Sequence, residues 1–356
     1  GIDCPTTCSA TFVPGTPVTL RAIPASDAAF FSGWSQSCSG GGLCQLRISD
    51  SQSVVRAGFL PSKVCRGAFC WEAPLPQGNS LRAVYVRSDQ DAWAIGDGGT
   101  ILHWFGSTWA PVRSSTSVAL WGIYGKGEEL WVVGDGGTIL KYDGRQFAAL
   151  TSSTNANLHA IAGNGTDVFI AGDGGTLLRW SGSTFSPITN ASKENLRGLS
   201  VSSSEVWAVG ENGTAVRYKN GRLDVIPTGV TATLNSVAER VSGETWLAGE
   251  GGTLLKWNGS SFAAPALGSS LSIYALWVTP NGELWAAAGF GTLRRFDGTT
   301  WTSYGASAAQ NLFAIHGSAS NEAWAAGESG LLVHWNGVTW TPLQNQAPDS
   351  VLAIGS

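Results

Sequence analysis

The chain has 356 residues, of which 43% are hydrophobic and 13% are charged, and its formal net charge at pH 7 is −4. This composition is typical of a folded protein, and it excludes the basic surface that binding to nucleic acid or to an anionic membrane requires. No apolar run approaches the roughly 18 residues of a membrane-spanning helix. No signal peptide begins at Gly1, so we interpret the sequence as a mature or trimmed fragment.

Residues 1–60 contain no internal repeat and predict a small β module. Their runs of β-branched, Leu and aromatic residues are broken by Gly, Pro and Ser, which is typical of short strands. The expected strands lie at residues 17–23, 30–33, 45–49 and 54–59.

Six cysteines form three pairs that are close in sequence. Local pairing predicts the disulfides Cys4–Cys8, Cys38–Cys44 and Cys65–Cys70, although the sequence alone permits other connectivities. The even number, in a chain without Met, favours an oxidising, extracytoplasmic compartment. Zinc binding is the alternative, but the spacings lack Cys-x-x-Cys and no His is adjacent, so we expect no metal here.

The module resembles the internalin-type B-repeat domains of bacterial surface and secreted proteins. The similarity lies in Gly1-Ile2-Asp3-Cys4, Val18-Thr19-Leu20-Arg21-Ala22, Phe31-Ser32-Gly33-Trp34-Ser35, Cys38-Ser39-Gly40, Cys44 and Val54-Val55-Arg56-Ala57-Gly58-Phe59. Members of that family usually carry one more strand before the position of Gly1, so this module is expected to begin partway through. The resemblance implies a role as a spacer or an adhesin-like stalk.

Residues 61–80 are expected to form a disulfide-containing linker. Within this linker, residues 69–75 resemble a stray outer strand of the repeats that follow. At the other end of the chain, residues 351–356 resemble a stray innermost strand.

Residues 81–356 repeat one pattern seven times. Each copy reads roughly Leu-x-Ala-Ile, a polar stretch, an aromatic residue, Ala-x-Gly-(Asp/Glu)-Gly-Gly-Thr, two aliphatic residues, a basic residue and an aromatic residue. The first aromatic positions are spaced by 38, 38, 38, 39, 39 and 39 residues, at Trp93, Trp131, Phe169, Trp207, Trp246, Trp285 and Trp324. A regular period of this length indicates a ring or an array of one repeated unit.

Four short strands fit each copy, and helix signals are nearly absent. In the first copy the alternation of apolar and polar residues predicts strands at residues 81–86, 92–96, 100–104 and 108–112. Asp97-Gly98-Gly99 is expected to connect the second strand to the third. Such tight turns need positive φ angles, which Gly adopts without a steric penalty.

The predicted fold is all-β: a β-propeller of four-stranded antiparallel blades, preceded by the disulfide-stapled β domain. Seven blades follow from the seven copies. An eighth blade built from the two stray terminal strands is the alternative, and an open solenoid is a further one.

The repeats resemble propellers of secreted proteins and lipoproteins of myxobacteria, through the introducing segment Cys70-Trp71-Glu72-Ala73-Pro74-Leu75-Pro76-Gln77-Gly78-Asn79 and the copies themselves. Asp143-Gly144-Arg145-Gln146-Phe147 and Asp297-Gly298-Thr299-Thr300-Trp301 are distantly similar to the Asp-box turns of sialidase-like and photosystem-assembly propellers. An Asp box is a turn motif, so this similarity implies a fold and not sugar cleavage.

Candidate functional residues are those that vary within the repeated frame. The residue x of Leu-x-Ala-Ile lies at the start of the innermost strand and is expected to surround the mouth of the channel. We call these seven positions the mouth residues: Arg82, Trp121, His159, Arg197, Asn235, Tyr274 and Phe313. Their guanidinium, imidazole, amide and aromatic groups suit a concave site for a sugar or a peptide, and packing between blades is the alternative.

Acidic residues recur at the turn between the second and third strands, on the same end as the mouth residues. These turn acids are Asp97, Asp135, Asp173, Glu211, Glu250 and Glu328, and the sixth copy departs from the rule at Gly289-Phe290-Gly291. A cationic partner or Ca²⁺ is conceivable for such a ring, but no Asp-x-Asp-x-Asp loop is present to wrap calcium. We expect turn chemistry, in which the carboxylates bond their own backbone and stay solvated.

Every third strand ends in a basic residue followed by an aromatic residue. The pairs are His103-Trp104, Lys141-Tyr142, Arg179-Trp180, Arg217-Tyr218, Lys256-Trp257, Arg295-Phe296 and His334-Trp335. We expect the aromatic residues to fill the wedges between blades and the basic residues to pair across blades. Sugar stacking on Trp104, Trp180, Trp257 and Trp335 is the functional alternative.

The sequence contains no arrangement typical of an enzyme. The four histidines are not part of Gly-x-Ser-x-Gly or His-Glu-x-x-His, and no phosphate-binding loop is present. A sialidase would need an arginine cluster, and Arg82 and Arg197 are the only arginines among the mouth residues. We therefore predict a protein without catalytic residues.

The sequence predicts a secreted or cell-surface bacterial module, lectin-like or adhesive, that binds a glycan or an extracellular protein at the mouth residues. Alternatives are a structural subunit that self-associates through its terminal strands and a glycan-active hydrolase or lyase. No cofactor is expected beyond the calcium alternative, and no nucleic acid or membrane span is expected.

Overall fold

A computed structural model describes residues 11–20, 29–37, 44–48, 55–61, 64–66, 69–71, 79–106, 108–144, 146–189, 192–240, 242–306 and 308–343. The chain divides into two compact units, Gly1–Glu72 and Ala73–Ser356. In the described residues, no helix is long and apolar enough to cross a membrane.

The first unit contains three antiparallel strand pairs. Strand β1 (Pro17–Leu20) pairs with β3 (Cys44–Arg47), β2 (Ala29–Gln36) with β4 (Val55–Pro61), and β5 (Val64–Arg66) with β6 (Phe69–Trp71). The described part of the expected stray outer strand, β6, therefore pairs with β5 within the first unit.

Cys65 lies directly opposite Cys70 in the β5–β6 pair. Cys4, Cys8 and Cys38 lie outside the described residues, so the three disulfides stay predictions.

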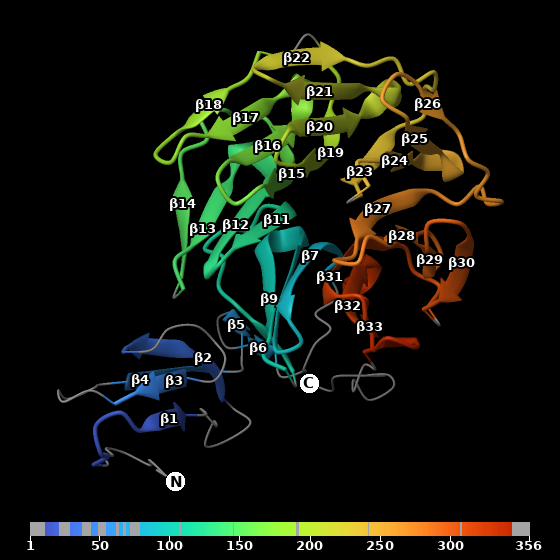
Figure 1. Cartoon of the computed structure of the whole chain (residues 1–356). Coiled ribbons are helices and arrows are strands. Elements are labelled where there is room, and N and C mark those ends of the chain that lie inside the picture. Colours follow the sequence, from blue (N-terminus) through green and yellow to red (C-terminus); the bar gives the residue numbers. More distant parts are fainter. Residues whose placement is uncertain are drawn as a thin grey trace, which may run out of the picture. The chain divides into compact units, whose positions relative to one another are not determined.

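The second unit consists of seven four-stranded antiparallel sheets, each formed by one continuous stretch of chain (Figure 1). Blades 1 to 3 contain β7 (Leu81–Ser88), β8 (Asp91–Gly96), β9 (Thr100–Trp104), β10 (Trp109–Pro111); β11 (Leu120–Lys126), β12 (Glu129–Gly134), β13 (Ile139–Tyr142), β14 (Phe147–Leu150); and β15 (Leu158–Gly163), β16 (Val168–Gly172), β17 (Leu177–Trp180), β18 (Phe185–Pro187). Blades 4 and 5 contain β19 (Leu196–Val201), β20 (Glu205–Gly210), β21 (Ala215–Lys219), β22 (Arg222–Val225); and β23 (Leu234–Glu239), β24 (Thr245–Gly249), β25 (Leu254–Trp257), β26 (Phe262–Ala263). Blades 6 and 7 contain β27 (Ile273–Val278), β28 (Leu284–Ala288), β29 (Thr292–Phe296), β30 (Trp301–Gly305); and β31 (Leu312–Ala319), β32 (Glu322–Gly327), β33 (Leu332–Trp335), β34 (Trp340–Pro342).

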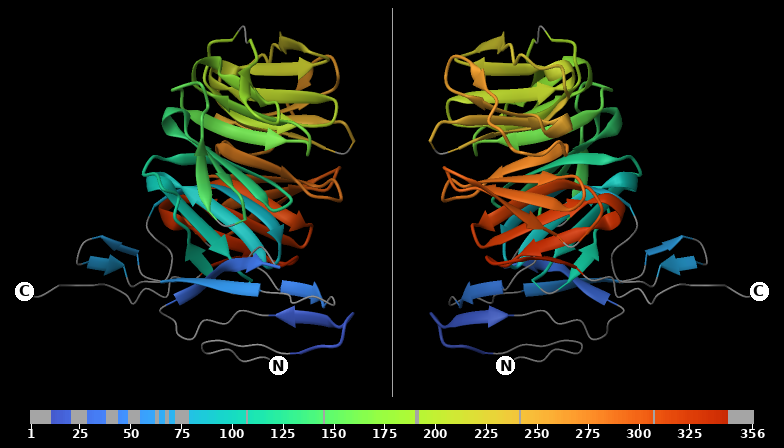
Figure 2. Two further views of the ribbon diagram at one scale, coloured as in Figure 1. Left: turned by 90° about the vertical axis from the view of Figure 1, so that its left-hand side faces the viewer. Right: turned by 90° about the vertical axis from the view of Figure 1, so that its right-hand side faces the viewer.

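The seven blades close into a ring. The first strand of each blade contacts the first strand of the next, and β31 of blade 7 contacts β7 of blade 1. The side views show the red seventh blade next to the cyan first blade (Figure 2). The predicted seven-bladed propeller is confirmed, and the eight-bladed and open alternatives are wrong. Residues 351–356, the expected stray strand, lie outside the described residues.

Aromatic residues fill the wedge between each pair of neighbouring blades, as expected. The second-strand aromatic of each blade contacts the third-strand aromatic of the next blade, with ring centroids 5.1 to 6.2 Å apart. The pairs are Trp93–Tyr142, Trp131–Trp180, Phe169–Tyr218, Trp207–Trp257, Trp246–Phe296, Trp285–Trp335 and Trp324–Trp104. The last pair joins blade 7 to blade 1, so the wedge packing also closes the ring.

A histidine also contributes to this closure. The backbone N–H of Val86 in blade 1 donates a hydrogen bond to Nδ1 of His316 in blade 7, at 3.0 Å. The His316 ring packs against Tyr85 and Trp277, with centroids 5.0 and 6.2 Å away. Because this bond requires an unprotonated Nδ1 and the ring is removed from water, burial lowers the pKa of His316 to about 4.

The turns between second and third strands explain the repeated glycines. In six blades this turn is a short 3-10 element: η1 (Asp97–Gly99), η2 (Asp135–Gly137), η3 (Asp173–Gly175), η4 (Glu211–Gly213), η5 (Glu250–Gly252) and η6 (Glu328–Gly330). Gly137 has a φ of +74°, and a Cβ atom there would lie 1.9 Å from the carbonyl oxygen of Thr154. The second glycine is therefore required both by backbone conformation and by close packing against the link to the next blade.

Candidate binding face at the mouth of the channel

Antiparallel pairing brings the mouth residues and the turn acids to one end of the propeller. In blade 1, Leu81 at the start of β7 pairs with Gly96 at the end of β8, and Asp97 follows immediately. The same register recurs in the other blades, with Leu120 opposite Gly134 in blade 2. We call this end the mouth end.

Each mouth residue occupies a β-bulge. The register between first and second strands shifts between Leu81 and Ala83 in blade 1 and at the equivalent position in all seven blades. The skipped residue is Arg82, Trp121, His159, Arg197, Asn235, Tyr274 or Phe313 in turn. A bulge removes a residue from the ladder and re-aims its side chain. The alternation of apolar and polar residues in the first strands does not indicate this bulge.

In blades 1 to 4 the mouth residue bonds the acid of its own turn. The pairs are Arg82 with Asp97 (2.9 and 2.8 Å), Trp121 with Asp135 (2.7 Å), His159 with Asp173 (2.6 Å) and Arg197 with Glu211. The hydrogen bond from Arg197 lowers the pKa of Glu211. We had expected these carboxylates to bond their own backbone. Instead, they and the mouth residues form one network, because the bulge directs the side chain toward the turn.

Asparagines before the first strand extend this network, and we did not single them out from the sequence. Asn157 donates from Nδ2 to Asp173 (2.9 Å), and its Oδ1 accepts from the N–H of Gly136 in the preceding blade (3.0 Å). Asn195 makes the equivalent bonds to Glu211 (3.1 Å) and to the N–H of Gly174 (2.9 Å). The recurrence of Asn directly before Leu-x-Ala or Leu-x-Gly was the available signal.

Blades 5 to 7 do not repeat the pairing. Asn235 donates to the carbonyl of Ile273 (3.0 Å), and Glu250 is exposed, with no ion pair or hydrogen bond to its carboxylate from the described residues. Tyr274 meets Phe313 edge to face at 5.2 Å. Glu328 accepts a bond from the backbone N–H of Asn311 (3.2 Å). Among the described residues, no mouth residue therefore donates from its side chain to the carboxylate of Glu250 or Glu328, in contrast to blades 1 to 4.

Phe290 is the least expected residue at the mouth end. It occupies the turn of blade 6, where the other blades have Gly, Asn or Ser, and it has a φ of +54°. Its side chain is 69% exposed, and its N–H donates to Oδ1 of Asn311 (3.3 Å). The sequence showed that blade 6 lacks an acid, but it did not indicate that an aromatic side chain would project here. A bulky residue at positive φ is strained and needs an explanation.

Burial affects two further mouth residues. Burial raises the pKa of the Tyr274 phenol, and the nearby carboxylates of Glu328 and Glu250 raise it further. The His159 side chain is 9% exposed, and its Nδ1 is buried without a hydrogen-bond partner among the described residues.

The opposite ends of the blades carry a different, repeated cluster. The basic residue of the third strand pairs with an acid at the start of the second strand of its own blade. The pairs are His103–Asp91 (2.9 Å), Lys141–Glu129 (2.7 Å), Arg179–Asp167 (3.0 Å), Lys256–Glu244 (2.5 Å), Arg295–Glu283 and His334–Glu322 (2.8 Å). Arg217 instead lies over Trp207 and Trp257, at 5.6 and 5.8 Å.

The expected pairing across blades is therefore wrong. The register sets His103 opposite Trp93, and Asp91 lies on the same face of the sheet two residues before Trp93. The acid and the base are thus diagonal neighbours within one blade. Trp257 and Trp335 are only 9% and 2% exposed, so a sugar cannot stack on these two third-strand Trp residues.

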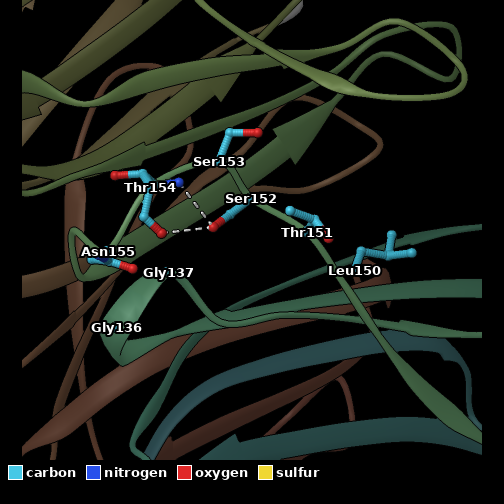
Figure 3. Close-up of a pocket in the computed structure, with 8 residues that line it drawn as sticks. All are labelled: Gly136, Gly137, Leu150, Thr151, Ser152, Ser153, Thr154 and Asn155. Atoms are coloured by element: carbon cyan, nitrogen blue, oxygen red, sulfur yellow. Dashed lines mark hydrogen bonds between the residues drawn. The ribbon is translucent and has the colours of Figure 1, made fainter.

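A pocket of about 370 Å³ lies beside the turn of blade 2 (Figure 3). Its lining, which includes Gly137, Ser152 and Thr154, carries no titratable side chain. Ser152 Oγ donates to the carbonyl of Thr154 (2.9 Å), and Ser114 makes the same bond to Thr116 in blade 1 (3.0 Å). We interpret this pocket as the space around a repeated turn.

Within the described part of the chain, no group of three or more His, Cys, Asp or Glu side chains is placed to hold a metal ion. The turn acids belong to different blades, and four of them already bond mouth residues.

No model of a known protein family matches the chain, and no curated protein matches it. Solved structures do match. YCF48 bound to a D1 peptide is 20% identical with a TM-score of 0.62, covering 74% of this chain and 95% of that one. The WD40 propeller domain of Doa1 is 13% identical with a TM-score of 0.62, covering 77% of this chain and 96% of that one. Virginiamycin B lyase from Staphylococcus aureus is also 13% identical, with a TM-score of 0.64, covering 73% of this chain and 96% of that one. At these identities the likeness shows the β-propeller fold alone. The finer resemblances to internalin-type B-repeats and to myxobacterial propellers stay predictions.

Proposed function

We propose that the propeller is a non-catalytic recognition module that binds a segment of a partner protein at the mouth end, in an extracytoplasmic setting. The observation that carries this proposal is the variation of the mouth residues. Seven blades repeat the same bulge, yet the bulge holds Arg, Trp, His, Arg, Asn, Tyr and Phe in turn. If packing alone decided this position, we would expect one residue type to recur, as Trp does in the second strands.

Two further observations support a ligand at this end. The buried Nδ1 of His159 has no partner among the described residues, and a buried polar atom without a partner is costly, so a bound molecule that bonds this atom is favoured. Among the similar structures, YCF48 is bound to a D1 peptide, so a protein of comparable fold binds a peptide. Glycan binding, which the sequence also suggested, is the competing hypothesis.

The test is a selection of displayed random linear peptides on the immobilised full chain, in parallel with a glycan array. Enrichment of related peptides, with a silent glycan array, is the expected result. The selected peptides should lose about tenfold or more in affinity when Trp121 or Tyr274 is replaced by Ala. The exposed Val338→Ala variant, in the turn between β33 and β34, is the matched control. A selective glycan hit without peptide enrichment would overturn the proposal.

A further inference from the structure

The protein already contains one complete site for a cationic side chain at the mouth end. The Arg82 guanidinium carbon lies 4.8 Å from the Trp121 ring and 4.9 Å from the Phe313 ring. The same guanidinium forms two hydrogen bonds to the Asp97 carboxylate, at 2.9 and 2.8 Å. Aromatic faces and a carboxylate together neutralise and desolvate this cation.

The side of the mouth formed by blades 5 to 7 has the same components, but its carboxylates pair with no cationic side chain among the described residues. We call it the acidic–aromatic sector: Glu250, Tyr274, Phe290, Phe313 and Glu328. In blade order, the Phe290 turn lies between the turns that carry Glu250 and Glu328. No Lys, Arg or His among the described residues forms an ion pair with either carboxylate, whereas the Asp or Glu side chains of the first four turns all have side-chain partners.

The parts of this sector lie close together. The η5 turn packs against β27, and the N–H of Gly251 donates to Oγ of Ser272 just before that strand (3.3 Å). Glu250 and Glu328 lie in the turns of the two blades that flank the Tyr274 blade, and both carboxylates raise the pKa of the Tyr274 phenol. Phe313, edge-on to Tyr274, continues the apolar surface toward Arg82.

Phe290 adds an exposed apolar surface that the fold does not require. Glycine at this position would adopt the observed φ of +54° without strain. Blades 1, 2, 3 and 5 have Gly here. A strained aromatic residue that is 69% exposed is accounted for when it contacts a ligand.

We propose that the acidic–aromatic sector binds a Lys or Arg side chain of the partner peptide, held over Tyr274 between the Glu250 and Glu328 carboxylates, with Phe290 packed against the neighbouring peptide residue. The occupant is an extended basic segment, because the sector supplies aromatic faces and two carboxylates that no cation among the described residues pairs with. This inference rests on the proposed function.

The experiment uses the peptides selected on the full chain. We expect Lys or Arg at a fixed position in the enriched sequences. Replacing that residue by citrulline or norleucine should weaken binding by about tenfold or more, and the Glu250→Gln/Glu328→Gln double variant should weaken binding by a similar factor. The matched control is Asp89→Asn/Glu128→Gln, which removes two exposed charges from turns at the opposite ends of the blades and should leave affinity unchanged.

The outcomes separate the two proposals. Failure to enrich any peptide would overturn the proposed function. Enriched peptides without a basic residue, or basic peptides that bind the Glu250→Gln/Glu328→Gln variant as well as the native chain, would overturn only this inference.

The Phe290→Gly variant gives a readout that a structural role would not produce. We expect it to weaken the selected peptides by about tenfold. We also expect its midpoint of urea unfolding to be equal to or above that of the native chain, because the substitution relieves strain. A lower midpoint with unchanged affinity would assign Phe290 to the fold and contradict its role in binding.

Discussion

The wedges between the blades and the mouth of the channel are built by the same seven repeats, but they differ in what varies. Each wedge pairs a second-strand aromatic with a third-strand aromatic, and the pairing recurs without exception around the ring. At the mouth the backbone bulge recurs, while the side chain on it changes from blade to blade. The comparison indicates that the repeated residues maintain the fold and that the varying ones are available for recognition.

The largest difference in stability between the two regions is expected when one tryptophan in each is replaced by Ala. Trp285 is fully buried in a wedge, so Trp285→Ala should lower the free energy of unfolding by about 3–5 kcal/mol. Trp121 is partly exposed and loses its bond to Asp135 and its contacts with Arg82 and His159, so Trp121→Ala should cost about 1–2 kcal/mol. Urea unfolding followed by tryptophan fluorescence and circular dichroism measures both. Equal losses would mean that the mouth is also a structural core.

The contact between blades 7 and 1, which includes His316, is expected to make stability depend on pH. His316 has a pKa of about 4 in the folded chain against 6.5 for the unfolded residue, so the unfolded state binds more protons between these values. Stability is therefore fully present above pH 6.5 and declines as the pH falls toward 4. We expect a loss of about 2 kcal/mol between pH 7.5 and pH 5 from this group alone.

The control for this test is His316→Gln, which cannot titrate. Its unfolding free energy should depend less steeply on pH over the same range, although other groups, such as His103, titrate in both proteins. If the unfolding free energies of the two proteins have the same pH dependence, His316 does not govern stability at acid pH.

The smallest difference is expected between two adjacent glycines in one turn. Gly136 and Gly137 both have positive φ, but a Cβ atom on Gly136 meets nothing within 4 Å, whereas one on Gly137 lies 1.9 Å from a backbone carbonyl. Gly136→Ala should cost about 1 kcal/mol from backbone strain, and Gly137→Ala about 2 kcal/mol or more. Thermal unfolding of the two variants measures the difference, and a reversed order would contradict the packing assigned to Gly137.

The sequence predicted the fold well because the propeller is specified by local chemistry. In blade 1 the expected strands 81–86, 92–96, 100–104 and 108–112 correspond to β7 to β10 within two residues at each end. The Asp-Gly-Gly turns and the aromatic wedges also follow directly from residue type and spacing.

The site was less predictable because it depends on details of register. The mouth residues could be identified from their variation, but the bulge that aims Arg82 at Asp97 has no signature in the alternation of apolar and polar residues. The partner of His103 was assigned to a neighbouring blade because the sequence does not show that Asp91 is its diagonal neighbour. From the sequence, the turn at Phe290 differs from the other turns only in lacking an acidic residue. The exposure of the Phe290 side chain depends on the backbone angle of this one turn, which the sequence does not show.

Each described blade is formed by one continuous stretch of chain, so none of these sheets combines strands from distant parts of the sequence. The ring is closed by side-chain packing and by the hydrogen bond between Val86 in the first strand of blade 1 and His316 in the first strand of blade 7. Duplication or loss of a single repeat would therefore add or remove one whole blade and leave every other sheet intact. The architecture can acquire a new mouth residue through an ordinary tandem duplication followed by substitution at one position, so recognition can diverge without rebuilding the scaffold.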